Sequence, residues 1–207
     1  PSKSARQKQA TWALWIKIVI ACIPAAVLGL LFDDWMEAHL YNAYVVAATL
    51  IIYGVLFIVL ENSSITANPS ITKVGHVSTK TALFIGLFQL LSLVPGTSRS
   101  GSTILGAMVL GCSRGVAAEF SFFLGIPVMF GASFLKLVKF FVKGNVLTGP
   151  QIFYTILGMA IAFGVSVYSI QFLMGYVRRH DFKFFGYYRI ILGVVVLAYF
   201  GITALAA

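Results

Sequence analysis

Apolar runs alternate with short polar stretches along the whole chain, and most of these runs are long enough to cross a lipid bilayer. A helix needs about 20 mostly apolar residues to span a hydrocarbon core of about 30 Å. The pattern therefore predicts an all-α, polytopic membrane protein with its C-terminus outside. The expected membrane-spanning helices cover residues 11–32, 41–60, 116–141, 151–177 and 186–205.

Two further apolar runs, residues 81–94 and 104–111, are too short to span a bilayer. Between them lies the polar segment 95–103, which reads Pro-Gly-Thr-Ser-Arg-Ser-Gly-Ser-Thr. Irregular backbone at membrane depth is tolerated only where it is buried in protein or lines a polar cavity. The spacing therefore predicts a re-entrant helical hairpin over residues 81–112, with its turn near the bilayer midplane.

The polar segment 95–103 combines one arginine and two glycines with five hydroxyl side chains. A helix that begins here offers free N–H groups and a partial positive charge, and a guanidinium can bind two oxygens at once. Since a charged residue at membrane depth typically marks a functional site, the segment predicts a phosphate or diphosphate site. The alternative is a small-residue packing turn whose arginine reaches the surface. The expected phosphate-binding residues are Gly96, Thr97, Arg99, Gly101, Ser102 and Thr103, and the catalytic candidates are Arg99, Ser98 and Ser100.

Composition and charge agree with a membrane protein. Of the residues, 59% are hydrophobic and 10% are charged, against about 25% charged in a soluble domain. The net charge of +9 raises the question of nucleic acid. However, the basic residues cluster at the ends of apolar runs, where they set membrane topology, so we expect no nucleic-acid partner. Arg178 and Arg179 fit an inner loop, whereas Lys136, Lys139 and Lys143 lie at an expected outer end.

The remaining polar side chains suggest structural roles. Asp33, Asp34, Glu37 and His39 predict a short solvated loop, because their spacing is not that of a calcium-binding loop. No metal ligand is identifiable in this chain.

Near the predicted site, Gln89 and Glu119 are candidates for supporting residues. Glu119 either pairs with a basic residue such as Arg114 or enters the site, and the first interpretation is favoured because buried carboxylates usually have a partner.

Segment 95–103 resembles the signature of the undecaprenyl-diphosphate phosphatase family, also called bacitracin-resistance proteins. The resemblance extends in order over essentially the whole chain. It implies inverted-topology repeats whose re-entrant hairpins meet inside the membrane, with Arg99 binding pyrophosphate and Ser98, Ser100 and Thr103 in the site. The other residues that carry the resemblance are Gly86, Phe88, Gln89, Gly106, Gly111, Ser113, Arg114, Ala118–Phe122, Pro127, Tyr188 and Arg189.

This resemblance implies an enzyme of the bacterial inner membrane that hydrolyses undecaprenyl diphosphate to undecaprenyl phosphate and phosphate. Such a phosphatase recycles the lipid carrier of peptidoglycan synthesis and confers bacitracin resistance. Its partners would be a polyprenyl diphosphate lipid and the bilayer, and a homodimer is compatible with the sequence. Ser98 or Ser100 would orient the phosphate or attack it, and the sequence does not decide between these roles.

One family feature has no match in this chain. The family's first repeat carries two glutamates and a Ser-Ser-Thr-Gly-His element. We therefore expect residues 1–207 to form a single membrane domain from the C-terminal portion of a longer chain. The resemblance also implies a divalent cation, Mg²⁺ or Ca²⁺, whose ligands we expect in the missing segment.

Two other functions compete with the phosphatase interpretation. A non-enzymatic lipid-phosphate transporter or flippase can also be built from inverted repeats around a midplane anion site. The acid phosphatase superfamily with a histidine nucleophile also has a Ser-Arg element, but no suitably placed histidine follows Arg99, so this reading is set aside.

Overall fold

The computed structural model describes residues 5–177 and 180–206. Within these ranges the chain is helical and contains no β-strand, which confirms the all-α class. Arg178 and Arg179, predicted to lie in an inner loop, are outside the described residues. The α-helices are α1 (Ala5–Leu40), α2 (Ala43–Glu61), α3 (Thr79–Leu90), α4 (Arg99–Val109), α5 (Arg114–Val142), α6 (Gly149–Val177) and α7 (Lys183–Ala206). The short 3-10 helices are η1 (Ser64–Thr66), η2 (Val74–His76) and η3 (Leu91–Leu93).

Five helices, α1, α2, α5, α6 and α7, are long and apolar enough to cross a membrane. They coincide with the five predicted spans, so the chain is a multi-pass membrane protein. The apolar side chains of α6 face outward, as shown by Phe163 and Tyr168, each 73% exposed. Such a surface needs lipid or protein around it, because exposed apolar area of this extent is costly in water.

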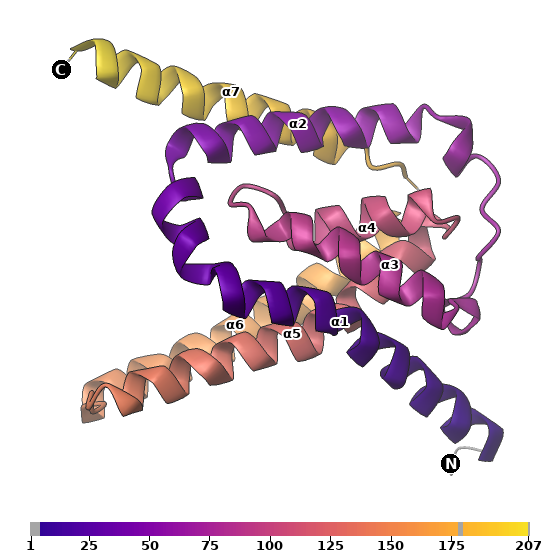
Figure 1. Ribbon diagram of the computed structural model, residues 1–207, viewed down its shortest axis with the longest axis horizontal. Coiled ribbons are helices and arrows are strands. Elements are labelled where there is room, and N and C mark those ends of the chain that lie inside the picture. The colour runs from indigo at the N-terminus through magenta and orange to yellow at the C-terminus, as the bar shows by residue number, and fades with distance from the viewer. Residues whose placement is uncertain (1–4, 178–179, 207) are drawn as a thin grey trace.

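The segment around Asp34 is helical, so the prediction of a loop at residues 33–39 is wrong. Helix α1 continues to Leu40, because no glycine or proline interrupts residues 30–40. The chain turns only at Asn42, whose side chain accepts a hydrogen bond from the Val45 amide at 3.0 Å and caps α2. Pro24 lies inside α1, and Figure 1 shows that this helix changes direction along its length.

The two short helices α3 and α4 form a helical hairpin at the predicted residues. In Figure 1 the hairpin is framed by α1, α2 and the segment that joins α2 to α3. Each of α3, α4 and α5 begins after a serine, and the side chains of Ser78, Ser98 and Ser113 accept a hydrogen bond from a first-turn amide. These N-caps fix where each helix starts. Placement of the hairpin within a bilayer and the inverted repeat stay predictions.

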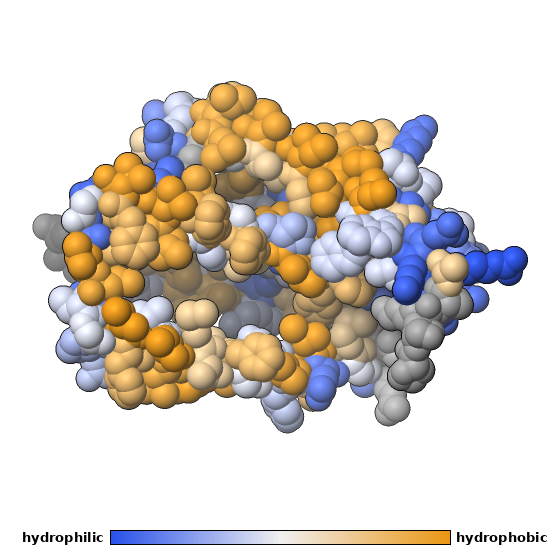
Figure 2. Space-filling model, turned by 90° about the horizontal axis from the view of Figure 1, so that it is seen from below, coloured by the Kyte–Doolittle hydropathy of each residue, from blue (hydrophilic) through white to orange (hydrophobic). Residues whose placement is uncertain are grey.

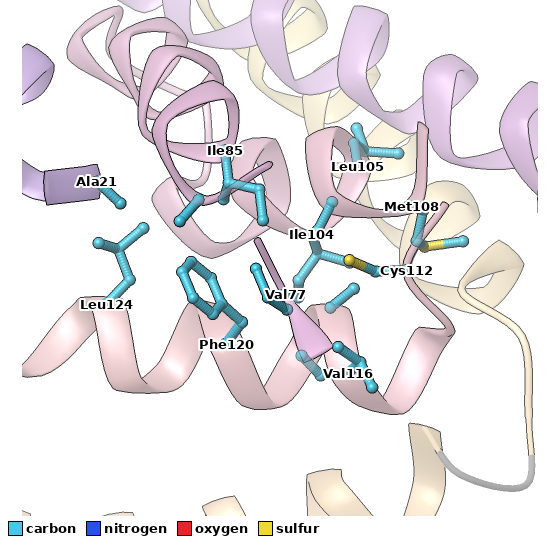
Figure 3. Packing of buried hydrophobic residues seen from close by; sticks show 14 of the residues in the cluster. Ala21, Val77, Ile85, Ile104, Leu105, Met108, Cys112, Val116, Phe120 and Leu124 are labelled. Atoms are coloured by element: carbon cyan, nitrogen blue, oxygen red, sulfur yellow. The ribbon is translucent and has the colours of Figure 1, made fainter. Parts of the chain in front are cut away.

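A core of buried apolar residues fixes the hairpin to α1 and α5. Figure 3 shows this core, in which side chains from α1, α3, α4 and α5 point toward one another. Ile85 of α3 and Phe120 and Leu124 of α5 are fully buried. Gly86 of α3 lies directly against the backbone of Ala21 in α1, so no side chain fits between these helices. The hairpin is therefore a tightly packed part of the protein.

Helices α2 and α7 form a second, equally close pair beside the hairpin (Figure 1). A Cβ added to Gly54 would lie 2.7 Å from the Gly186 carbonyl oxygen, and one added to Gly186 would lie 2.7 Å from that of Gly54. Any larger side chain at these positions would separate the helices. This close approach brings Arg189, one turn beyond Gly186, near the hairpin.

Candidate active site

The turn between η3 and α4 is packed against α2. Gly96 has φ 83°, a backbone conformation that favours glycine. A Cβ at this position would also collide with Thr49 and with the backbone of Val46. The Thr49 hydroxyl donates a hydrogen bond to the Pro95 carbonyl at 2.8 Å. The turn is thus fixed by both its conformation and its contact with α2.

The N-terminus of α4 follows this turn and provides free amide groups. The Ser98 hydroxyl accepts a hydrogen bond from the Gly101 amide at 3.1 Å and lies 3.2 Å from the Ser100 hydroxyl. The Ser102 amide donates to the Ser98 carbonyl. Since the first amides of a helix have no intrahelical partner, the N–H groups of Arg99 and Ser100 are available to an anion.

Ser102 and Thr103 direct their hydroxyl groups back to their own helix. Both hydroxyls donate to the Arg99 carbonyl at 3.0 Å. Thr103 Oγ1 also lies 2.6 Å from Ser121 Oγ of α5, and both residues are buried. These hydroxyls therefore hold α4 together and attach it to α5, and their predicted contact with phosphate stays a prediction.

The Arg99 guanidinium lies against α5 at Gly125. A Cβ at Gly125 would be 2.6 Å from Arg99 Nη2 and 3.1 Å from Nη1, so any other residue here would require the guanidinium to shift. Arg99 Nη1 is buried and has no hydrogen-bond partner among the described residues. In the part of the chain that the structure describes, no carboxylate forms an ion pair with Arg99. The arginine is therefore positioned, yet its charge is not neutralised.

Unpaired polar atoms gather on and around the hairpin. The buried side-chain atoms without a hydrogen-bond partner in the described ranges are both amide atoms of Gln89, Thr97 Oγ1, Arg99 Nη1 and Arg189 Nε. Buried polar atoms are normally paired, and each unpaired one costs about 1–3 kcal/mol. Four of these atoms can donate to ligand oxygen atoms, whereas Gln89 Oε1 can only accept. Gln89, predicted to support the site, belongs to this group.

One face of the protein combines hydrophilic residues with an apolar surface. Figure 2 shows a face that is hollowed near its centre, with apolar residues around the rim and hydrophilic residues inside. A hollow with hydrophilic residues inside an apolar rim suits a ligand with a charged head and an apolar body.

Arg189 is a contact residue that the segment 95–103 did not identify. Its Nη2 donates to the Gly96 carbonyl at 2.8 Å, and its guanidinium carbon lies 5.8 Å from the centre of the Tyr53 ring. The sequence carries two signals for it, because Arg189 is among the residues that carry the family resemblance and lies within the apolar run of the last predicted span. Thr49 and Gly125 also contact the site residues, and their sequence surroundings offer no signal of this.

Arg114 pairs with Glu61, so the predicted pair of Arg114 with Glu119 is wrong. Arg114 Nε lies 3.0 Å from both carboxylate oxygens of Glu61, and Nη2 lies 2.5 Å from one of them. The Phe182 amide also donates to this carboxylate at 3.0 Å. Glu119 is half-buried and has no ion pair among the described residues. Its entry into the site stays a prediction.

The residues around Arg99 do not fit a divalent cation. Within the described ranges, no group of three or more histidine, cysteine, aspartate or glutamate side chains could hold a metal ion. The site instead offers hydroxyls, one amide and a guanidinium, whereas Mg²⁺ and Ca²⁺ prefer carboxylate oxygens. The chemistry of these residues favours an anion.

Comparison with known proteins gives consistent matches. The sequence profile of the family described as "Bacitracin resistance protein BacA" matches residues 1–195. A protein of Streptococcus thermophilus (strain CNRZ 1066) named "Undecaprenyl-diphosphatase" is 56% identical over 199 residues, which is 96% of this chain and 69% of that protein. Proteins of the same name from Enterococcus faecalis and Lactiplantibacillus plantarum are 51% and 55% identical, over 96% and 97% of this chain and 72% and 73% of their own lengths.

Proposed function

Because the chain belongs to the Bacitracin resistance protein BacA family, we propose that it hydrolyses undecaprenyl diphosphate to undecaprenyl phosphate and phosphate. The name shared by its relatives supports this reaction. The observation that carries the proposal is Arg99 at the N-terminus of α4, a half-buried arginine whose buried Nη1 has no hydrogen-bond partner and which has no carboxylate partner in the described chain. Such a group favours a multiply charged anion such as a diphosphate.

Arg99 and the first amides of α4 would bind the phosphate oxygens and stabilise the charge that develops as the P–O bond breaks. Preorganised donors of this kind typically contribute about 10²–10³-fold in rate each. The Ser98 hydroxyl accepts the N-cap hydrogen bond of α4 and lies beside the Ser100 hydroxyl, so the cap does not use its proton and either serine can orient a phosphate oxygen. Both serines remain candidates for the attacking group.

The reaction would take place in the cytoplasmic membrane of a bacterium, where the lipid carrier of cell-wall synthesis is used. The apolar outer surfaces of α5 and α6 suit a bilayer, and the hollow with hydrophilic residues suits a lipid with a diphosphate head (Figure 2). A divalent cation, Mg²⁺ or Ca²⁺, stays an expectation from the family. We assign it no ligand and no step here.

The test is phosphate release from a polyprenyl diphosphate by the complete protein in detergent. We expect Arg99→Ala to abolish release, because no other described side chain replaces its two-oxygen contact. The control is Lys73→Ala, which removes a cation from an exposed position outside the site. Near-normal release by Arg99→Ala would remove Arg99 from the mechanism, and no release by the unaltered protein would overturn the proposed reaction.

A further inference from the structure

Two helices outside the hairpin hold consecutive carbonyl groups of its turn. The Pro95 carbonyl accepts a hydrogen bond from Thr49 of α2, and the Gly96 carbonyl accepts one from Arg189 of α7, each at 2.8 Å. These carbonyls belong to adjacent peptide groups, three and four residues before α4 begins. Since a peptide group is planar, fixing both carbonyls fixes the direction in which the chain enters α4.

Arg189 itself is fixed by its surroundings rather than by an acidic residue. Its helix packs closely on α2, because Gly54 and Gly186 let the two backbones come into contact. The Tyr53 ring lies 5.8 Å from its guanidinium carbon, within the range of a cation–π contact. Within the described ranges no carboxylate forms an ion pair with Arg189.

An arginine that only stabilised a helix pair would find its acceptors on that pair. Arg189 instead reaches across to the turn that carries Thr97, Ser98 and Arg99, 93 residues away in sequence. Retaining an unneutralised guanidinium in an apolar surrounding is costly, and a simple apolar contact would hold α2 against α7 equally well.

We propose that Arg189 is a positioning residue of the phosphatase site, which acts by holding the Gly96 carbonyl and thereby aiming Arg99 and the N-terminal amides of α4. The kinetic consequence of this inference rests on the proposed function, whereas the hydrogen bond between Arg189 and Gly96 is independent of it. A displacement of about 1 Å in a catalytic group can lower the rate about 10²-fold. Loss of the contact should therefore lower kcat more than it raises KM.

The experiment compares Arg189→Met, Arg189→Lys and Thr49→Val in the complete protein. Methionine keeps much of the apolar volume and removes every donor, lysine keeps a donor and the charge, and valine removes the other hydrogen bond to the turn. We expect Arg189→Met to lower kcat roughly 30-fold or more with KM within about threefold. Arg189→Lys should recover part of that loss, because its ammonium can donate to the same carbonyl.

A second readout does not depend on activity. Hydrogen–deuterium exchange of the peptide that covers residues 95–103 should become faster in Arg189→Met, while peptides from α1 should exchange as before. This measurement also separates the two proposals. An inactive wild-type protein would overturn the phosphatase reaction, yet the exchange comparison would still test the positioning role.

Three results would overturn the positioning role. The first is an Arg189→Met variant with wild-type kcat and unchanged exchange at residues 95–103. The second is a large increase in KM at unchanged kcat, which would identify Arg189 as a direct substrate contact. The third is faster exchange throughout the protein, with Arg189→Lys as inactive as Arg189→Met, which would reduce Arg189 to a fold-stabilising residue.

Discussion

Arg99 begins the short helix α4, and Arg114 follows this helix as the first residue of α5. The two arginines differ in whether their charge has a partner. Arg114 makes three hydrogen bonds to the Glu61 carboxylate, which is 1% exposed and also accepts from the Phe182 amide. Arg99 has a buried nitrogen with no partner and no ion pair among the described residues. The sequence places both arginines beside apolar runs, and only the structure distinguishes the paired Arg114 from the unpaired Arg99.

The pairing of Arg114 has a structural consequence. Its carboxylate partner ends α2, Arg114 begins α5, and Phe182 immediately precedes α7, so one buried group joins three helices. A buried carboxylate with these partners has all its strong hydrogen-bonding positions in use. Among the described residues nothing comparable neutralises Arg99, so its charge is available to an anion.

The largest expected difference is between activity and stability at Arg99. Arg99→Met should lower kcat/KM by about 10³-fold or more, since it removes a guanidinium that would stabilise developing charge. The thermal midpoint of unfolding should stay the same or rise, because the variant no longer buries an unpaired charge. Phosphate release and thermal unfolding in detergent measure the two effects. A fall in stability with unchanged activity would contradict this prediction and make Arg99 a structural residue.

Removing the partner of Arg114 should have the opposite signature. Glu61→Ala leaves Arg114 without its carboxylate and should destabilise the protein by about 3 kcal/mol, the lower end of the range for a broken buried pair, since Arg114 is partly exposed. The activity of the molecules that remain folded should change little. Unfolding curves and phosphate release provide the measurement.

The matched control for Glu61→Ala is the exposed pair of Asp181 and Lys183. Its nitrogen and oxygen atoms are 3.6 Å apart, and both side chains are more than one third exposed. Asp181→Asn should therefore change stability by less than about 1 kcal/mol. Equal effects of the two substitutions would show that the Glu61 pair is not the link between the helices.

A substitution beside Arg99 tests its position without removing its charge. In Gly125→Ala the new Cβ would lie 2.6 Å from Arg99 Nη2, so the flexible guanidinium must shift. We expect kcat/KM to fall about 10- to 100-fold, because the guanidinium no longer meets the phosphate oxygens at the same place. Phosphate release and thermal unfolding measured together distinguish this shift from a loss of folded protein.

Gly131→Ala is the control for Gly125→Ala. Gly131 lies on the same helix, and no atom lies within 4 Å of a Cβ added there. This variant should keep its activity and gain slightly in stability, since alanine favours helices over glycine by about 1 kcal/mol. If both alanine variants were fully active, the contact of Gly125 with Arg99 would have no functional weight.

The sequence predicts the features that depend on local pattern. Five spans follow from hydropathy alone, and the hairpin follows from two short apolar runs on either side of segment 95–103. Gln89, predicted near the site, is one of the buried residues with unpaired atoms. These predictions succeed because helix length and polarity are properties of neighbouring residues.

Contacts between distant residues could not be read from the same pattern. Arg114 pairs with Glu61, 53 residues away, rather than with the nearby Glu119, and Arg189 bonds to a carbonyl 93 residues away. Gly125 is important for the space it leaves, which depends on how α5 crosses Arg99. Such contacts are fixed by tertiary packing, and a single sequence carries no direct sign of them.

The smallest expected effects concern the buried hydroxyl pair of Thr103 and Ser121. A hydroxyl has one proton, and Thr103 Oγ1 lies within hydrogen-bond distance of two carbonyls of α4 and, at 2.6 Å, of Ser121 Oγ. Either hydroxyl can be the donor between Thr103 and Ser121. Like Arg114, Thr103 therefore has hydrogen-bond partners within the protein. We expect Thr103→Val and Ser121→Ala each to lower the free energy of unfolding by about 1 kcal/mol.

The double variant decides whether these hydroxyls act as a pair. If they stabilise each other, the loss of stability in the double variant should be smaller than the sum of the two single losses, because the second substitution removes an interaction that is already broken. Phosphate release should stay within about threefold of the unaltered protein in all three variants, since both hydroxyls already have partners within the protein. A loss of several orders of magnitude in Thr103→Val alone would instead make Thr103 a phosphate ligand, and full occupancy by protein partners would no longer separate structural residues from binding residues.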